Sequence, residues 1–304
     1  MNVVIAGANG FIGSALAPHL IETGHIVTGL VRNPEAARRT LPESIALLPW
    51  SPAANGEWRD AVASADVVVN LAGASIAGKR WSPEYKKLLR DSRIESTRAI
   101  VEAMRDSSRP GGALLNMSAV GYYGDGGDRV LTEADLPGAG FMAALCVDWE
   151  TEACLAREFG ARVVLLRTGI VLGEGGALAK MLPPFRLGIG GPLGSGRQWM
   201  SWIHREDAAS MIAWAAQDAS ISGPLNVTAP NPVTMKEFAS TLGRVLRRPG
   251  IFPVPGLALR LLLGEFADAL LTGQRVLPKA AESNGFTWRY PTLETALRNI
   301  ISDS

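Results

Sequence analysis

A short apolar strand that leads directly into three evenly spaced glycines constrains the fold of this chain more than any other feature. Residues 3–5 (Val-Val-Ile) are β-branched and give the continuous apolar run typical of a strand buried in a parallel sheet. Gly7 then permits a tight turn, Gly10 lets a ligand approach the backbone, and Gly13 lets the next helix pack close to the sheet. The pattern predicts a strand, a turn and a helix in that order.

The rest of a βαβ unit follows within about 30 residues, as a dinucleotide-binding fingerprint requires. A helix is predicted over 14–23, ended by Gly24, and a second strand over 26–31. The N-terminal amide groups of such a helix face the pyrophosphate of a bound dinucleotide. The alternative is a glycine-rich turn that binds nothing, and the complete βαβ unit favours the dinucleotide.

The end of the second strand indicates which dinucleotide binds. NAD sites usually carry an acidic residue here, which accepts hydrogen bonds from the ribose hydroxyls. This chain has Val31 and Arg32 instead, and its next carboxylate is Glu35. The planar guanidinium of Arg32 can pair with a 2′-phosphate, so we expect NADP(H) rather than NAD(H). A merely solvated arginine is the alternative.

Strand and helix patterns alternate through the first two-thirds of the chain. Further strands are expected at 45–50, 66–73, 113–118 and 162–167, and further helices at 58–64, 83–104 and 141–159. Alternation of this kind predicts an α/β fold, with a doubly wound parallel Rossmann-type sheet covered by helices on both faces.

A smaller C-terminal substrate lobe is expected beyond this sheet. Residues 173–200 contain eight glycines and three prolines, which predict loops around a binding site. A helix near 206–217 and a strand at 224–228 return to the main sheet. The expected nucleotide-binding domain is therefore 1–170 with 205–228, and the lobe is 171–204 with 229–304. In the tail, apolar residues at helical spacing are expected to cover core, a dimer face being the alternative: Leu257, Leu261, Leu262, Phe266 and Leu270.

Composition excludes several classes of function. The formal net charge is +1, so we expect neither a nucleic-acid nor a membrane partner. The three histidines show no metal-ligand spacing, so no metal site is expected. Cys146 and Cys154 lie about 12 Å apart on one predicted helix and cannot bridge. The chain starts in a strand without a leader-like segment, and a cytoplasmic protein is expected.

Several motifs resemble the extended short-chain dehydrogenase/reductase superfamily, in its sugar-nucleotide epimerase/dehydratase branch. They are the glycines at 7–13, Asn-Leu-Ala-Gly at 70–73, Tyr-Gly at 123–124, Arg-Thr-Gly-Ile-Val-Leu-Gly at 167–173 and Trp-Ile-His at 202–204. Ser-Arg-Ile-Glu-Ser-Thr at 92–97 and Gly-Ser-Gly-Arg-Gln-Trp at 194–199 are similar to an NAD(P)-dependent epimerase subgroup, sometimes labelled a SulA-type cell-division inhibitor. The resemblance covers nearly the whole chain.

The resemblance implies an NADP(H) cofactor and a small-molecule substrate, with a sugar nucleotide as one candidate. Its implied contacts add Leu71, Ala72 and Arg93 to the glycine-rich turn and Arg32. The full expected cofactor set is Gly7, Asn9, Gly10, Phe11, Ile12, Gly13, Val31, Arg32, Leu71, Ala72, Gly73 and Arg93. A homodimer is an open alternative for the oligomeric state.

The usual proton-transfer residues of the superfamily are missing. Its hydride-transferring members use Tyr-x-x-x-Lys on one helical face, where the lysine charge lowers the pKa of the tyrosine. None of the four tyrosines here is followed four residues later by lysine. Counting back from Glu150 places Met142 and Cys146 at the tyrosine and lysine positions, and neither side chain can transfer the proton.

Other residues near the expected carboxyl edge of the sheet are candidates for catalysis. Ser118 and Tyr123 are the first choices, and Tyr122, Glu133 and His204 are further candidates. Counting from Gly124 lands on Ala119, so Ser118 reaches the site only if a bulge shifts the strand register. Three functions therefore stay open: an NADP-dependent epimerase or oxidoreductase with another proton donor, a catalytically inactive NADP(H)-sensing regulatory protein, and a scaffold stabilised by its cofactor.

Overall fold

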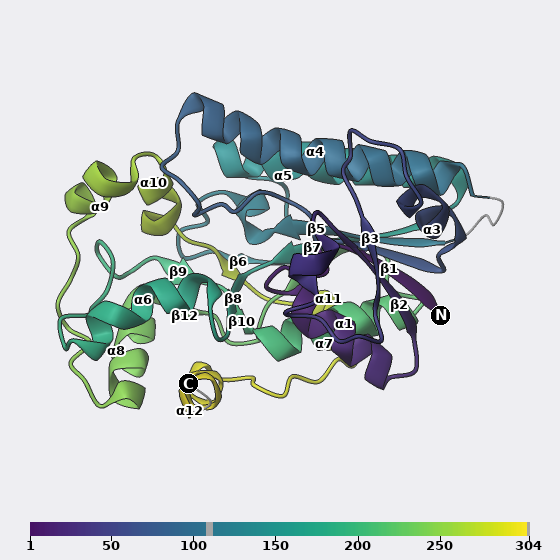
Figure 1. Ribbon diagram of the computed structural model, residues 1–304. Coiled ribbons are helices and arrows are strands. Elements are labelled where there is room, and N and C mark those ends of the chain that lie inside the picture. The colour runs from purple at the N-terminus through teal and green to yellow at the C-terminus, as the bar shows by residue number, and fades with distance from the viewer. Residues whose placement is uncertain (108–111, 303–304) are drawn as a thin grey trace.

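A seven-stranded parallel sheet forms the centre of the protein in the computed structural model, which describes residues 1–107 and 112–302 (Figure 1). The strand order is β11-β7-β5-β4-β1-β2-β3. The strands are β1 (Asn2–Ala6), β2 (Ile26–Val31), β3 (Ala46–Pro49), β4 (Val67–Asn70), β5 (Ala113–Ala119), β7 (Arg162–Thr168) and β11 (Gly223–Val227). The predicted α/β class and its Rossmann-type sheet are confirmed.

The position of β1 follows from its sequence. Residues 3–6 are buried on both faces, as a central parallel strand requires. β1 pairs with β2 on one side and with β4 on the other. The chain therefore changes direction across the sheet at β1, and ligands of such folds bind outside the carboxyl ends of the strands at this point.

Helices cover both faces of the sheet, as Figure 1 shows. One apolar core packs the sheet against α1 and α7, and a second core packs it against α3, α4 and α5. These helices are α1 (Gly13–Glu22), α3 (Trp58–Ser64), α4 (Pro83–Arg105), α5 (Phe141–Cys154) and α7 (Arg205–Gln217). The short helices α2 (Pro34–Ala37) and α11 (Lys279–Ser283), and the 3-10 helices η1 (Val120–Tyr123) and η2 (Leu155–Phe159), connect these elements.

A separate apolar core lies beyond the carboxyl ends of the strands, at the left of Figure 1. Its helices are α6 (Gly176–Arg186), α8 (Met235–Leu246) and α12 (Leu293–Ser302), with α9 (Gly256–Leu263) and α10 (Phe266–Leu271) beside them. Short strands join it to the main sheet: β6 (Val130–Leu131), β8 (Ile170–Leu172), β9 (Trp199–Met200), β10 (Trp202–His204), β12 (Val233–Thr234) and β13 (Arg275–Val276).

Two expectations for this lobe are wrong. The glycine-rich stretch after residue 173 is not all loop, because α6 forms there despite Pro183 and Pro184 and buries Leu178 and Phe185. The tail leucines do not all cover core either, since Gly264 separates α9 from α10. α9 buries only Leu259, and the side chains of Leu257, Leu261 and Leu262 are 71–73% exposed. The tail residues do form helices, but Leu257, Leu261 and Leu262 of α9 face away from the core instead of covering it.

Candidate functional site

The glycine-rich turn between β1 and α1 is packed so tightly that a side chain would not fit at Gly7 or Gly13. Gly7 has φ +78°, which favours glycine, and a Cβ there would lie 3.2 Å from the Leu71 carbonyl carbon. A Cβ on Gly13 would lie 2.5 Å from the Gly7 carbonyl oxygen. The start of α1 therefore approaches the end of β1 at backbone distance, as the sequence predicted.

The N-terminus of α1 is open to an anion. No side chain among the described residues caps it, and the position before its first residue is Ile12. The amide group of Ser14 bonds the Gly10 carbonyl, while Asn9 and Gly10 are exposed. Uncapped amide groups at a helix N-terminus bind phosphate well. Asn9 and Gly10 therefore leave the backbone of the turn exposed in front of the uncapped start of α1.

Arg32 lies directly after β2, next to this turn. The amide of Gly7 donates to the carbonyl of Leu30, which ties the turn to the end of β2. Val31 is buried, and the side chain of Arg32 is exposed. Asn33 accepts from the amide of Ala36 and begins α2, so it is already bonded. An exposed positive side chain therefore stands at the end of β2, beside the glycine-rich turn.

The exit of β4 is shaped by buried polar residues. The amide of Ala72 donates to Oδ1 of Asn70 at 3.2 Å, and Nδ2 of Asn70 donates to Oδ1 of Asn116 at 2.8 Å and to Thr97 at 3.0 Å. These bonds hold the backbone of residues 70–72 where it leaves the sheet. Sequence reasoning missed this role, although an asparagine inside an otherwise apolar strand was a signal for it.

Arg93 is a buried cation beside the exit of β4. One Nη donates to the carbonyl of Leu89 at 2.9 Å, and the guanidinium lies 5.1 Å from the ring centroid of Trp149. A Cβ on Gly73 would lie 3.3 Å from the Cζ of Arg93, a tight contact, so the guanidinium lies directly beside the Gly73 backbone. Burial lowers the pKa of Arg93, and no carboxylate of the described residues forms an ion pair with it. A buried cation without a carboxylate is suited to a polar or anionic ligand group.

Ser118 contacts a buried ion pair rather than open space. Its hydroxyl donates to Glu150 at 2.7 Å, and Glu150 accepts two bonds from the guanidinium of Arg167 at 2.9 Å each. β5 and β7 pair without interruption through Ser118, so there is no bulge at this position. Ser118 is 2% exposed. That Ser118 transfers a proton stays a prediction. Its hydroxyl proton is used in the hydrogen bond to Glu150.

Tyr123 is held in the same network. Its hydroxyl donates to Oδ1 of Asn226 at 2.8 Å and lies 3.1 Å from an Nη of Arg167. Burial raises the pKa of Tyr123 to about 12, although Arg167 acts in the opposite direction. The Arg167 guanidinium lies over the ring of Tyr122, with its Cζ 3.4 Å from the ring centroid. Both tyrosines therefore stabilise the charge of Arg167 where they lie.

Glu133, another sequence candidate, closes this network from the outside. Its Oε1 accepts from the backbone amides of Asn226 and Ala280 at 3.1 and 3.2 Å. Burial raises the pKa of Glu133. Glu133 and Asn226 are 93 residues apart, so no sequence pattern connects them. Asn226, like Asn70, is a polar residue within an apolar strand, and this pattern is the feature of the sequence that points to a buried polar contact.

Met142 and Cys146, which are expected at the tyrosine and lysine positions, both pack against neighbouring residues. A Cβ on Gly121 would lie 3.2 Å from the Cβ of Met142, so Met142 packs against η1. Cys146 is buried, its Sγ lies 3.7 Å from the carbonyl oxygen of Ala119, and burial raises its pKa to about 11. A thiol with this pKa is protonated at neutral pH and cannot replace a lysine cation.

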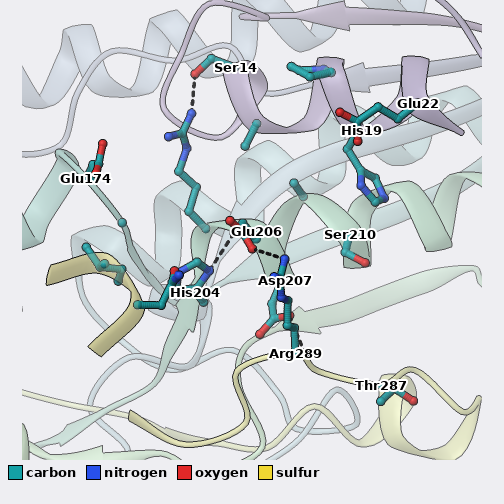
Figure 2. Close-up of a pocket in the computed structure, with 17 residues that line it drawn as sticks. Ser14, His19, Glu22, Glu174, His204, Glu206, Asp207, Ser210, Thr287 and Arg289 are labelled. Carbon is teal, nitrogen blue, oxygen red and sulfur yellow. Dashed lines mark hydrogen bonds and ion pairs between the residues drawn. The ribbon is translucent and has the colours of Figure 1, made fainter. Parts of the chain in front are cut away.

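His204 lies in a different part of the molecule, at the edge of a groove of about 630 Å³ between α1 and α7 (Figure 2). Its Nδ1 accepts from the amide of Glu206 and begins α7. Arg205 crosses the same groove and donates to the carbonyl of Phe11 at 2.7 Å and to Ser14 at 2.9 Å. This face is covered by α1 and α7, whereas Ser118 contacts α5 on the opposite face. The structure therefore does not bring His204 together with Ser118 and Tyr123.

Within the described residues, no group of three or more His, Cys, Asp or Glu side chains is placed to hold a metal ion. Across residues 1–107 and 112–302, none of the helices has the length and apolar character needed to cross a membrane.

The chain is similar to known protein families, to named relatives and to solved structures. The model of the NAD dependent epimerase/dehydratase family matches residues 3–227, and that of a domain of unknown function, DUF1731, matches residues 254–300. Epimerase family protein MT2273 of Mycobacterium tuberculosis is 46% identical over 97% of this chain and 96% of its own length. Epimerase family protein YfhF of Bacillus subtilis is 41% identical over 100% and 99%. The crystal structure of human epimerase family protein SDR39U1 with NADPH matches with a TM-score of 0.88 and 33% identity, and the match covers 100% of both chains.

Proposed function

The chain belongs to the NAD dependent epimerase/dehydratase family, within the extended short-chain dehydrogenases/reductases, and on that premise we propose that it binds NADP(H) at the carboxyl edge of β1 and β4. The residues present fit this cofactor. The Gly7–Gly13 turn would hold the pyrophosphate, Arg32 the 2′-phosphate, and Leu71, Ala72, Gly73 and Arg93 the part of the cofactor beyond β4. A human relative was crystallised with NADPH, which supports the same assignment.

We further propose that cofactor binding, not acid–base turnover of a substrate, is the main function of this site. One observation carries the proposal: the hydroxyls of Ser118 and Tyr123 are both bonded within the buried Glu150–Arg167 network. The positions of the usual pair hold Met142 instead of a phenol and a neutral buried thiol instead of a cation. A protein of this kind would report the level of NADP(H) through its conformation or a partner.

An epimerase or oxidoreductase acting on a small molecule, such as a sugar nucleotide, is the second candidate. The observation in its favour is the Tyr123 hydroxyl 3.1 Å from the Arg167 guanidinium, because a fixed cation beside a phenol stabilises the phenolate. In this case Ser118 and Tyr123 are the catalytic residues, and Asn226 must release Tyr123 when the substrate binds.

The test is to load the purified protein with NADPH and, separately, with NADP⁺, and to add a panel of aldehydes, ketones and nucleotide sugars. Reduction of a carbonyl is followed at the nicotinamide absorbance band, and epimerisation, which regenerates the cofactor, is followed by NMR of the sugar products. We expect saturable NADPH binding, no substrate-dependent change in absorbance and no epimerised sugar. Turnover that disappears in Tyr123→Phe while NADPH binding is retained would support the second candidate and overturn the first.

The division into domains is also a proposal. We propose a nucleotide-binding part made of residues 1–170 and 205–228, and a substrate lobe made of 171–204 and 229–304, whose last two residues lie outside the described ones. The pairing of β11 with β7 in the main sheet supports this division, because it returns the chain from the lobe to the sheet. Limited proteolysis should cut first between these parts.

A further inference from the structure

Exposed apolar side chains lie on α9 and on the segments that follow α6 and precede α9. Figure 1 shows α6 and α9 at the left, away from β1, β2 and β3. Six large apolar side chains there are 61–75% exposed: Leu187, Ile189, Ile251, Leu257, Leu261 and Leu262. Leu187, Ile189 and Ile251 come from two segments that run side by side, since the amide of Phe252 bonds the carbonyl of Gly190 and the amide of Val254 bonds that of Pro192. The three leucines lie on α9, which begins two residues after Val254. We call these six residues the lobe face. Exposed apolar side chains that gather in this way mark an interaction surface.

Basic side chains outnumber acidic ones in the lobe. Residues 171–204 and 229–304 contain twelve arginines and lysines and seven aspartates and glutamates, which gives a net charge of +5. The whole chain has a net charge of +1, so residues 1–170 and 205–228 carry −4. The small overall charge therefore conceals a separation between a basic lobe and an acidic main body.

Some of this positive charge is already neutralised, and some is not. Arg244 pairs with Glu294 at 2.7 Å and Arg260 with Asp268 at 2.9 Å. In the part of the chain that the structure describes, no carboxylate pairs with Arg186 or Arg248, and both are exposed. These two arginines lie in the chain next to Leu187 and close to Ile251, so unpaired cations border the lobe face.

We propose that the lobe face binds the surface of a bilayer containing anionic phospholipid. The leucines of α9 would enter the boundary between headgroups and acyl chains, while Arg186 and Arg248 would meet the lipid phosphates. Apolar side chains surrounded by basic ones are the pattern of proteins that lie on anionic membranes. Charge complementarity favours this partner over a second copy of the chain, because two copies would bring two basic lobes together.

The experiment is co-sedimentation of the full chain with vesicles of phosphatidylcholine alone and with vesicles that are half phosphatidylglycerol. We expect binding to the anionic vesicles that is at least about tenfold tighter, and that falls as salt is raised towards about 0.5 M. Binding that is absent, or equal for both vesicles, overturns the proposal.

Variants separate the two contributions. Leu261→Glu with Leu262→Glu, and separately Arg186→Glu with Arg248→Glu, should each lose at least about tenfold in vesicle binding. Leu136→Glu is the matched control, because Leu136 is 83% exposed but lies outside the lobe. An equal loss in this control contradicts the proposal. So does sedimentation of the wild-type protein as a dimer that Leu261→Glu with Leu262→Glu dissociates, if vesicles are not bound. Should the leucine variant fail to fold, the arginine variant and the lipid comparison still decide.

Discussion

At the scale of single residues, Arg32 determines which dinucleotide the site prefers. Replacing it with alanine should weaken NADPH binding by about 1–3 kcal/mol, the range for a charge-assisted hydrogen bond, and should hardly change NADH binding. Fluorescence titration with both cofactors measures the difference. Arg39→Ala, which removes another exposed arginine of the same region, is the control. Equal losses for NADPH and NADH in Arg32→Ala would falsify the assignment to the 2′-phosphate.

The Glu150–Arg167 pair belongs to the same scale, and its role is structural. Glu150→Gln leaves the buried Arg167 guanidinium without its counter-charge, so the free energy of unfolding should fall by about 3–5 kcal/mol. Tyr123→Phe removes the hydrogen bonds to Asn226 and Arg167 and should cost about 1–3 kcal/mol. Urea unfolding followed by circular dichroism tests both values. If Glu150→Gln costs less than Tyr123→Phe, the ion pair does not hold β7 to α5 as described.

His204 makes stability depend on pH. Burial lowers its pKa below the ordinary value of 6.5, so at mildly acidic pH the unfolded chain takes up the proton first. Stability contributed by neutral His204 is complete above about pH 6.5 and is lost as the pH falls from there towards the folded pKa, by at most about 1.4 kcal/mol per pH unit. His204→Gln should unfold with a weaker pH dependence between pH 6.5 and 5.5. An unchanged slope would show that His204 does not titrate on unfolding.

At the scale of elements, the contact between β1 and α1 is the most demanding one. Gly13→Ala would place a Cβ 2.5 Å from the Gly7 carbonyl, so α1 would have to move away from the turn. We expect NADPH affinity to fall at least about tenfold, because the amide groups of the helix then no longer meet the pyrophosphate. Gly112→Ala is a control, since its nearest atom would lie at 3.5 Å. Similar NADPH affinities for both variants would contradict the assignment.

The elements themselves were largely predictable. The helix expected over 83–104 is α4 (Pro83–Arg105), because Ser82 accepts from Tyr85 at its start and apolar residues recur along one face. The strands of the main sheet were predictable for the same local reason, a continuous apolar run. The division of the tail into α9 and α10 was not predictable. The face of a leucine-rich helix that meets the core depends on where the rest of the lobe lies, and the helix sequence alone does not specify that.

The candidate site was predictable where its residues share one turn and not where they meet across the fold. The Gly7–Gly13 turn and Arg32 are local features of a single βαβ unit. The network of Ser118, Glu150, Arg167 and Asn226 joins β5, α5, β7 and β11. No spacing rule connects residues so far apart in sequence. Only the strand order decides which buried polar side chains become partners.

At the scale of the whole molecule, the cofactor should act as a structural ligand. A cofactor that binds only the folded chain adds about 2.7 kcal/mol of stability at a concentration one hundred times its dissociation constant. NADPH should therefore raise the melting temperature measured by differential scanning fluorimetry, and the rise should be smaller in Gly13→Ala at the same NADPH concentration. A melting temperature that NADPH leaves unchanged at saturating concentration would contradict a site formed by the folded β1, β2 and β4.

The central claim is that the turn after β1 and the arginine after β2 together form an NADP(H) site. Isothermal titration calorimetry of the wild-type protein with NADPH and with NADH tests it most directly. We predict one site per chain and NADPH binding that is about tenfold or more tighter than NADH binding. Equal affinity for the two cofactors, or no heat of binding with either, would contradict the account.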